Sequence, residues 1–112
     1  MPIEKIKNAF RDTEGQEDSL RSLISELDHF EIARRLHELN VEQKVRVFHL
    51  LENDEVRQEL LYETDMDSRL EIQENLDRDY LAALLDGMPE DEATDIIQEL
   101  PDEAQEELLS KM

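Results

Sequence analysis

The chain has 112 residues, with 31 acidic and 12 basic side chains, a formal net charge of −19 and no cysteine. This charge argues against nucleic acid or anionic lipid as a partner, and the missing thiols exclude disulfides and thiolate metal sites. Acidic composition with few aromatic residues can indicate disorder, but apolar residues recur in phase from residue 20 to residue 112, which favours folding.

Size and hydropathy set the expected organisation. A chain of this length buries one modest core, so we expect a single globular domain overall, with residues 1–19 as an N-terminal helix and linker and 20–112 as the main unit. No apolar run approaches the roughly 20 residues of a membrane-spanning helix, and the N-terminus lacks a signal-peptide core. The sequence therefore predicts a cytoplasmic segment.

Two amphipathic helices are predicted before residue 28. The first covers residues 1–14 and begins near Pro2; its apolar face comprises Ile3, Ile6, Ala9 and Phe10. Gly15 is expected to end it, and Asp18 or Ser19 to cap the next helix. The apolar face of that second helix comprises Leu20, Leu23, Ile24 and Leu27.

From residue 28 onward the chain is a repeat of about twelve residues. The seven units are 28–39, 40–52, 53–64, 65–76, 77–88, 89–100 and 101–112. They open with Asp28, Asn40, Asn53, Asp65, Asp77, Pro89 and Pro101. Asp and Asn side chains accept hydrogen bonds from first-turn amides, and Pro lacks a donor that the helix start would leave unpaired. Each unit is therefore predicted to begin a new helix.

Apolar residues occupy the eighth, ninth and twelfth places of the units, which form one face of a helix. The clearest are Val47, Phe48, Leu51, Leu60, Leu61, Leu84, Leu85, Met88, Ile96, Ile97, Leu100, Leu108, Leu109 and Met112; the exceptions are Arg35, Thr64 and Gln73. Phe48 is expected in the core. Helices of roughly nine residues do not persist alone, so their apolar faces must pack together. The pattern predicts an all-α solenoid, a superhelix of short helices.

The sequence does not predict an enzyme. Glycine-rich phosphate loops are absent, and the abundant carboxylates single out no acid–base pair. His29, His37 and His49 have spacings of 8 and 12, which fit no usual helical pair of metal ligands. His37 and His49 hold equivalent places in their units, which suggests a repeated surface position.

Acidic residues are concentrated near the C-terminus. Residues 79–110 contain 11 carboxylates and no Lys, Arg or His. Such self-repulsion favours binding of a divalent cation or a basic partner. Asp91 and Asp95 are four residues apart, on one helix face, away from Ile96 and Ile97. One or two carboxylates suit Mg²⁺, which keeps several waters, better than Ca²⁺. An acidic pair at this spacing is also typical of a plain solvated helix face.

The run LDRDYLAALLDGMPEDEATDIIQELPDEAQEELLSKM (76–112), with its LPDEAQEELL ending and twelve-residue phase, resembles the N-terminal cytosolic domain of the MgtE family of magnesium transporters. The resemblance covers about residues 20–112. It implies a right-handed superhelix, followed in the family by a pair of CBS domains and a transmembrane pore, working as a homodimer at an inner or plasma membrane. It also implies magnesium sensing, with ion contacts at Asp91, Asp95 and Glu59, and Mg²⁺ held between this domain and the CBS domains closing the pore.

Two alternatives remain open from sequence. The chain stops at Met112, without CBS domains or a pore, so it is either an excised domain, which we expect, or a stand-alone relative. A stand-alone chain would be a helical-repeat adaptor that binds a basic protein partner, as fold alone does not fix function. A purely structural solenoid is the third reading, in which the carboxylates only maintain solubility.

Overall fold

The computed structural model of the chain describes residues 2–12 and 17–112, and the regular structure in these residues is entirely helical. The elements in order are α1 (Pro2–Asp12), α2 (Glu17–Glu26), α3 (His29–Arg35), the 3₁₀ helix η1 (Leu36–Glu38), α4 (Val41–Leu50), α5 (Asp54–Glu63), α6 (Met66–Glu74), α7 (Arg78–Asp86), α8 (Glu90–Gln98) and α9 (Asp102–Lys111). The predicted all-α fold class is confirmed.

The helices from α3 onward begin where the repeat predicts. The N-cap residues of α3 to α9 are the seven unit-opening residues. The five Asp and Asn caps accept a backbone N–H of the first turn in their side chains, and Asn40 forms a reciprocal capping box with Gln43. Pro89 and Pro101 make no side-chain cap bond, so their contribution is the preset φ and the absent donor.

The first two helices match the predictions in part. The start of α1 at Pro2 is confirmed; the expected last residues of this helix, 13 and 14, and the stop at Gly15 lie outside the described residues. The prediction that Asp18 or Ser19 caps α2 is wrong, because α2 already includes Glu17 and both residues lie in its first turn. Carboxylates are favourable in a first turn as well as at a cap, so the acidic stretch permitted an earlier start.

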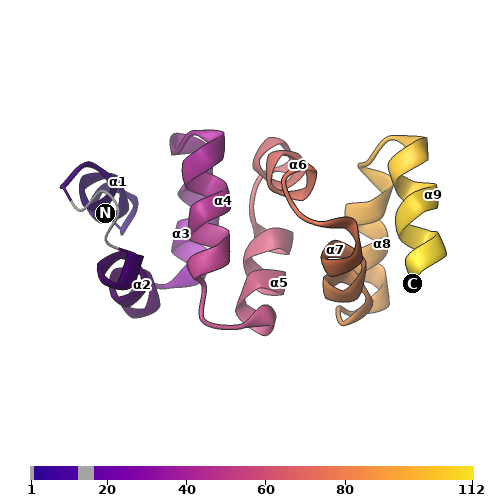
Figure 1. Cartoon of the computed structure of the whole chain (residues 1–112), viewed down its shortest axis with the longest axis horizontal. Helices are drawn as coiled ribbons and strands as arrows, with labels where there is room; N and C mark the ends of the chain where they lie inside the picture. The colour runs from indigo at the N-terminus through magenta and orange to yellow at the C-terminus, as the bar shows by residue number, and fades with distance from the viewer. Residues whose placement is uncertain (1, 13–16) are drawn as a thin grey trace.

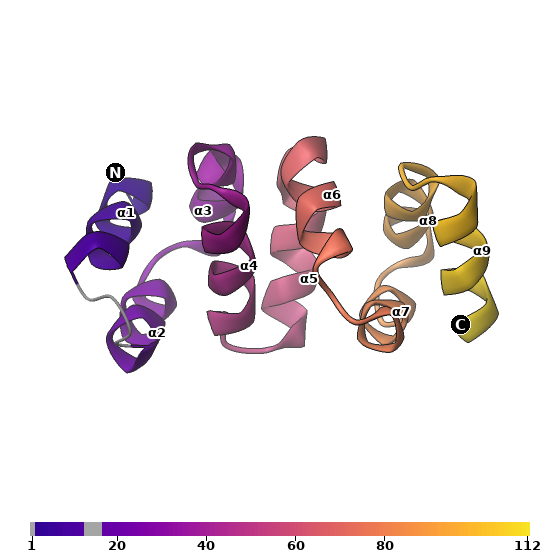
Figure 2. The ribbon, with the colours of Figure 1, turned by 45° about the horizontal axis from the view of Figure 1, so that its top comes forward.

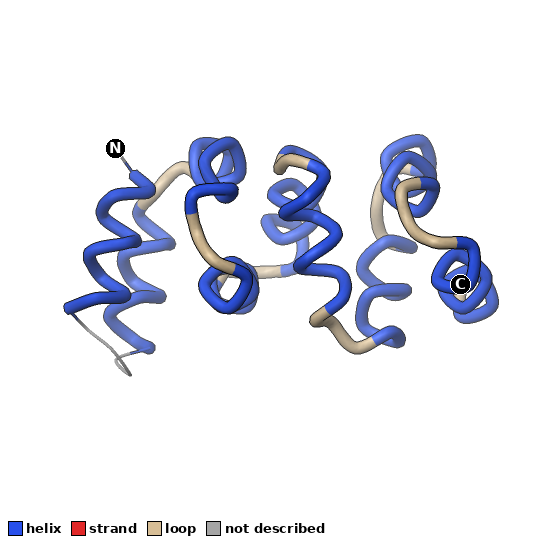
Figure 3. The backbone as a smooth tube through the Cα atoms, turned by 90° about the horizontal axis from the view of Figure 1, so that it is seen from above, coloured by secondary structure: helices blue, strands red, loops and turns tan. Residues whose placement is uncertain are grey.

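The helices are stacked along one axis. Helices two places apart make the most extensive contacts, as in α3 with α5, α4 with α6 and α7 with α9. Figure 1 and Figure 2 show the chain advancing from α1 at one end to α9 at the other, within 42 × 21 × 21 Å. Seen from above, short loops join the helices, of which some are seen from the side and others along their axes (Figure 3). The right-handed twist of the superhelix and the boundary predicted between residues 19 and 20 stay predictions.

The repeat's apolar face forms the core. Buried residues include Phe48, as predicted, and the eighth-place residues Val47, Leu60, Ile72, Leu84, Ile96 and Leu108. Two polar exceptions, Thr64 and Gln73, are also buried, and the Thr64 hydroxyl donates to the Ala33 carbonyl over 3.0 Å. Leu109 and Met112 were predicted to be buried but are exposed, because no later described helix covers α9. None of the described helices is long and apolar enough to cross a bilayer.

Candidate functional site

The predicted metal contacts on α8 lie on its solvent side. Pro89 starts this helix, and Ala93, Ile96 and Ile97 turn one side of it into the core. Asp91 and Asp95 are therefore both exposed, as the spacing predicts. Neither makes an ion pair among the contacts of the described residues. Both carboxylates are exposed to solvent, and Asp95 accepts a hydrogen bond from the Tyr62 hydroxyl.

The third predicted contact, Glu59 on α5, already has a partner within the chain. Its carboxylate lies 2.6 Å from the Nε2 atom of His29 on α3, and the His29 ring packs against Phe30 at a centroid distance of 4.3 Å. About 41% of the Glu59 side chain is exposed, so one face of the carboxylate remains accessible. Any ion at Glu59 has to share it with His29. The other two histidines, His37 and His49, are exposed, as their repeated position suggested.

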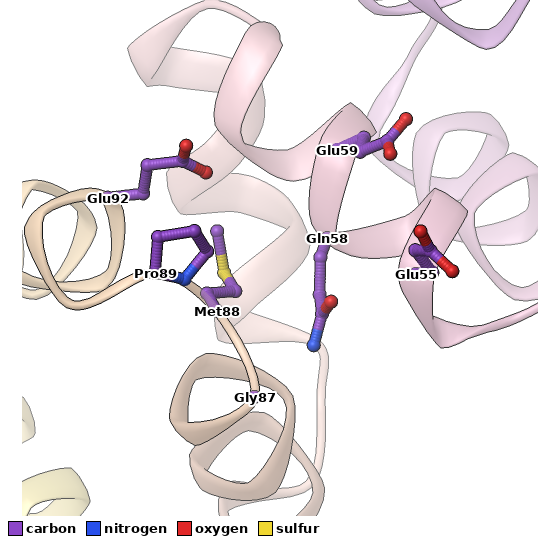
Figure 4. A pocket seen from close by; sticks show the side chains of 7 residues that line it. All are labelled: Glu55, Gln58, Glu59, Gly87, Met88, Pro89 and Glu92. Carbon is purple, nitrogen blue, oxygen red and sulfur yellow. The ribbon is translucent and has the colours of Figure 1, made fainter.

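The structure separates these residues into two neighbouring hollows rather than one site. The first, of about 510 Å³, is lined by Glu55 and Glu59 from α5 and by Glu92 from α8. Figure 4 shows that Glu92 extends toward α5 while Glu55 and Glu59 point in other directions, so the three carboxylates do not converge. The second hollow, of about 540 Å³, contains Asp95 together with Tyr62. Asp91 lines neither of the two.

Tyr62 reports the electrostatic field of the α8 acids. Its pKa is raised, first by partial burial and then by the negative charges of Asp95, Glu92 and Asp91, with a hydrogen bond to Asp95 adding to the effect. Of these α8 acids, Asp95 and Glu92 each line a hollow together with residues of α5. Glu92 was not predicted as an ion contact from the spacing of the α8 acids. It lines the hollow between α5 and α8 and contributes to the negative potential at Tyr62.

Arg69 fixes the position of α5 relative to α8. Its buried guanidinium donates to the carbonyls of Leu61, Tyr62 and Thr64, each over 2.7 Å, and so satisfies the C-terminal end of α5. The same group donates to both carboxylate oxygens of Glu99, at 2.6 and 2.8 Å. The ion pair joins α6 to the end of α8. The geometry between Tyr62 and the α8 acids therefore depends on Arg69.

Sequence reasoning missed this arginine, although the repeat contains a signal for it. Arg69 and Arg57 both occupy the fifth place of their units. Arg57 makes the equivalent contact one unit earlier: it donates to the carbonyls of Phe48, His49 and Leu51 at the end of α4. Gln105, again at the fifth place, donates to the Leu100 carbonyl over 2.8 Å. In these three units a donor at the fifth place therefore caps the preceding helix, whereas Lys44, at the same place of its unit, bonds the Glu71 carboxylate instead.

The donor set fits a hydrated magnesium contact but not a closed site. Within residues 2–12 and 17–112, no group of three or more His, Asp or Glu side chains is placed to hold one metal ion. Mg²⁺ binds through one or two carboxylates while retaining waters, and an exposed pair such as Asp91 and Asp95 is compatible with such a contact. Such a contact leaves part of the ion's coordination to water or to a second surface.

Stacked short helices and an acidic outer face define a helical-repeat domain, a class in which exposed surfaces carry the function. A family model described as the MgtE intracellular N domain matches residues 27–112. The chain belongs to this family and contains the N-terminal domain of an MgtE-type magnesium transporter. The match begins within a residue of the first repeat unit. The comparison with curated proteins gave no match.

Proposed function

We propose that the domain senses intracellular magnesium through the acidic face of α8 and regulates the pore of an MgtE-type transporter. The observation that carries the proposal is the pair of exposed carboxylates, Asp91 and Asp95, beside Tyr62 on α5. Membership of the MgtE family supports the choice of ion, and no catalytic reaction is assigned. Asp91, Asp95 and Glu59 are the proposed metal contacts.

The proposed mechanism is electrostatic. Bound Mg²⁺ supplies positive charge between this face and the facing CBS domains of the same homodimeric transporter. Asp91 and Asp95 then hold the two surfaces together through the ion's inner or outer shell. Without that charge, the 11 carboxylates of residues 79–110 repel any acidic surface placed against them and favour separation. Separation and approach are two states whose populations magnesium shifts, and the pore opens in the separated state.

The role of Glu59 in this mechanism is limited by its bond to His29. Because its carboxylate is bonded to His29 at 2.6 Å, the ion competes with an imidazole at this position. Glu59 therefore contributes a weaker contact than the α8 pair. The neighbouring carboxylates Glu55 and Glu92, which line the same hollow, add negative potential without completing a closed site.

Paramagnetic mapping tests the proposal on the chain itself. Mn²⁺ takes the same oxygen ligands as Mg²⁺ and broadens the NMR signals of nearby amides, even when binding is weak. We expect Mn²⁺ to broaden signals around Asp91, Asp95 and Tyr62 first, and Mg²⁺ to restore them. Sodium chloride of equal ionic strength should restore far less, because it acts only by screening.

Two matched double variants separate a site from general negative charge. Asp91→Asn with Asp95→Asn removes two charges from α8, and Asp102→Asn with Glu106→Gln removes two from an exposed, equally spaced pair on α9. The α8 variant should lose the selective broadening, whereas the α9 variant should keep it. Equal broadening in both variants, or uniform broadening over the whole acidic surface, would contradict the ion contacts proposed here.

A helical-repeat adaptor for a basic protein partner is the second candidate function. It is favoured by the exposed apolar side chains of Leu109 and Met112 beside the acidic run. Immunoblotting of membrane and soluble fractions separates the two. A membrane band several times heavier than this chain supports the transporter domain, and a soluble band of the chain's own mass supports the adaptor.

A further inference from the structure

The outer face of α9 breaks the burial pattern of the repeat. In the units from 53 to 100, the ninth-place residues Leu61, Gln73, Leu85 and Ile97 are at most 7% exposed. The twelfth-place residues Thr64, Leu76, Met88 and Leu100 are equally covered. In the last unit the same two places hold Leu109, 58% exposed, and Met112, 42% exposed. The core of the solenoid thus continues to the surface at α9.

These two side chains line a hollow rather than a flat surface. A groove of about 410 Å³ lies between α7, α8 and α9, and its apolar lining includes Met88, Ala93 and Ile97 as well as Leu109 and Met112. Two earlier helices have such a surface covered by the helix two places further along the chain, α5 by α7 and α7 by α9. The groove is therefore shaped to receive one more helix, in continuation of an established interface.

The charges around the groove determine what kind of helix fits. Ion pairs between helices two apart mostly join a cation on the earlier helix to a carboxylate on the later one. Examples are Arg34–Glu63, Lys44–Glu71, Arg69–Glu99 and Arg78–Glu107. This polarity cannot continue beyond α8, which contains no cation, and the Lys111 ammonium of α9 is bonded to Asp79 over 2.7 Å. An incoming helix therefore has to supply the positive charges itself.

From these observations we propose that the groove formed by α7, α8 and α9 docks an amphipathic helix from a protein partner, with an apolar face flanked by Lys or Arg. Leu109 and Met112 pack against its apolar face, and Asp86 and Glu90, which line the groove, pair with its cations. This docking holds whether or not the domain senses magnesium, because it uses no residue of the proposed ion contacts.

A second copy of the chain is a poorer occupant. Its terminal helix α1 has its main apolar side chains, Ile3 and Ile6, already buried, at 1% and 0% exposure. A second α9 face would bring the same carboxylates against those of the first. Two chains with a formal charge of −19 each also repel one another.

The test uses a synthetic amphipathic peptide with Leu at i, i+3, i+4 and i+7 and Lys on both flanks. A peptide of the same composition with Leu scattered around the helix serves as the control for charge alone. Isothermal titration of the full chain should show at least about tenfold tighter binding of the amphipathic peptide, since only this peptide buries Leu in the groove.

Two variants of the chain locate the binding site. Leu109→Ser with Met112→Ser changes only exposed groove residues and should weaken binding at least about tenfold. Val41→Ser with Met66→Ser, the matched control, changes two exposed apolar residues elsewhere, at 39% and 53% exposure, and should leave affinity unchanged. Unchanged unfolding temperatures verify that both variants are folded.

Equal affinity for the two peptides, or equal weakening by the two variant pairs, would overturn the proposal in favour of non-specific charge attraction. Sedimentation velocity without peptide tests whether a second copy of the chain occupies the groove. Self-association that Leu109→Ser with Met112→Ser abolishes would assign the groove to a second copy and would equally overturn it. A monomer at all concentrations, together with selective peptide binding, is the expected result.

Discussion

Replacing Arg69 with Met removes a buried cation that joins three helices. The change deletes three bonds to the carbonyls of Leu61, Tyr62 and Thr64 and two to the carboxylate of Glu99. The side chains of the ion pair are only 10% and 21% exposed, so water cannot fully replace these bonds. Breaking such a pair by removing one partner costs about 3–5 kcal/mol of unfolding free energy.

This loss is large for a domain of this size. Total unfolding free energies of small domains are about 5–15 kcal/mol, and each kcal/mol shifts the Tm by roughly 4–8 °C. Arg69→Met should therefore lower the Tm by more than about 10 °C, measured by circular dichroism at 222 nm. Glu99→Gln keeps one acceptor oxygen for the guanidinium and should cost less. The double variant should cost less than the sum of the two, because both changes remove the same interaction.

Arg78→Met is the matched control. Arg78 also pairs with a carboxylate two helices away, Glu107, but at 3.7 Å and with side chains 32% and 49% exposed. Loss of an exposed pair costs less than about 1 kcal/mol. If Arg69→Met destabilises the chain no more than Arg78→Met, Arg69 does not hold α5 and α8 together, and the reasoning fails.

Two further changes test the core and the acidic face. Ile96→Asp places a charge at a position that is 1% exposed and should prevent folding, whereas Gln98→Asp, at an exposed position of the same helix, should leave the circular dichroism spectrum unchanged. The raised pKa of Tyr62 means that the unfolded chain loses the phenol proton first, so stability should decrease as pH rises past the ordinary value near 10. Asp91→Asn with Asp95→Asn should lower that pKa, and an unchanged tyrosine absorbance titration would show that these carboxylates do not act on the ring.

The features that sequence predicted well are local ones. Each helix start from Asp28 to Pro101 was identified because capping depends on residues within one turn of each other. Burial of Phe48 followed from its place on an apolar face of period 3.6. The interruption of the first unit, where α3 ends at Arg35 and η1 follows, was not predicted, although Arg35 is an exception to the unit's apolar pattern.

The features that sequence did not predict depend on how helices two units apart meet. Thr64 looked like a gap in the apolar pattern, yet it is buried because its hydroxyl reaches a carbonyl on α3. Arg69 was not singled out from the sequence, because only the stacking brings the end of α8 to it. Glu92 and Glu59 line one hollow for the same reason. A twelve-residue pattern fixes each helix but not the rotation between successive helices.

Stacking with contacts mainly between helices two apart has a consequence for cooperativity. Such a chain behaves like a linear array in which the loss of one end unit removes few contacts from the other end. The last unit packs on the stack through Ala104 and Leu108 and through the ion pairs of Glu107 and Lys111 with α7. In contrast, the buried Arg69 joins α5, α6 and the end of α8. Amide hydrogen exchange should therefore be graded, fast at α9 and slow at α5. A partner helix bound at α9 would act as an end clamp and slow exchange mainly in α9 and in α7, which packs against it.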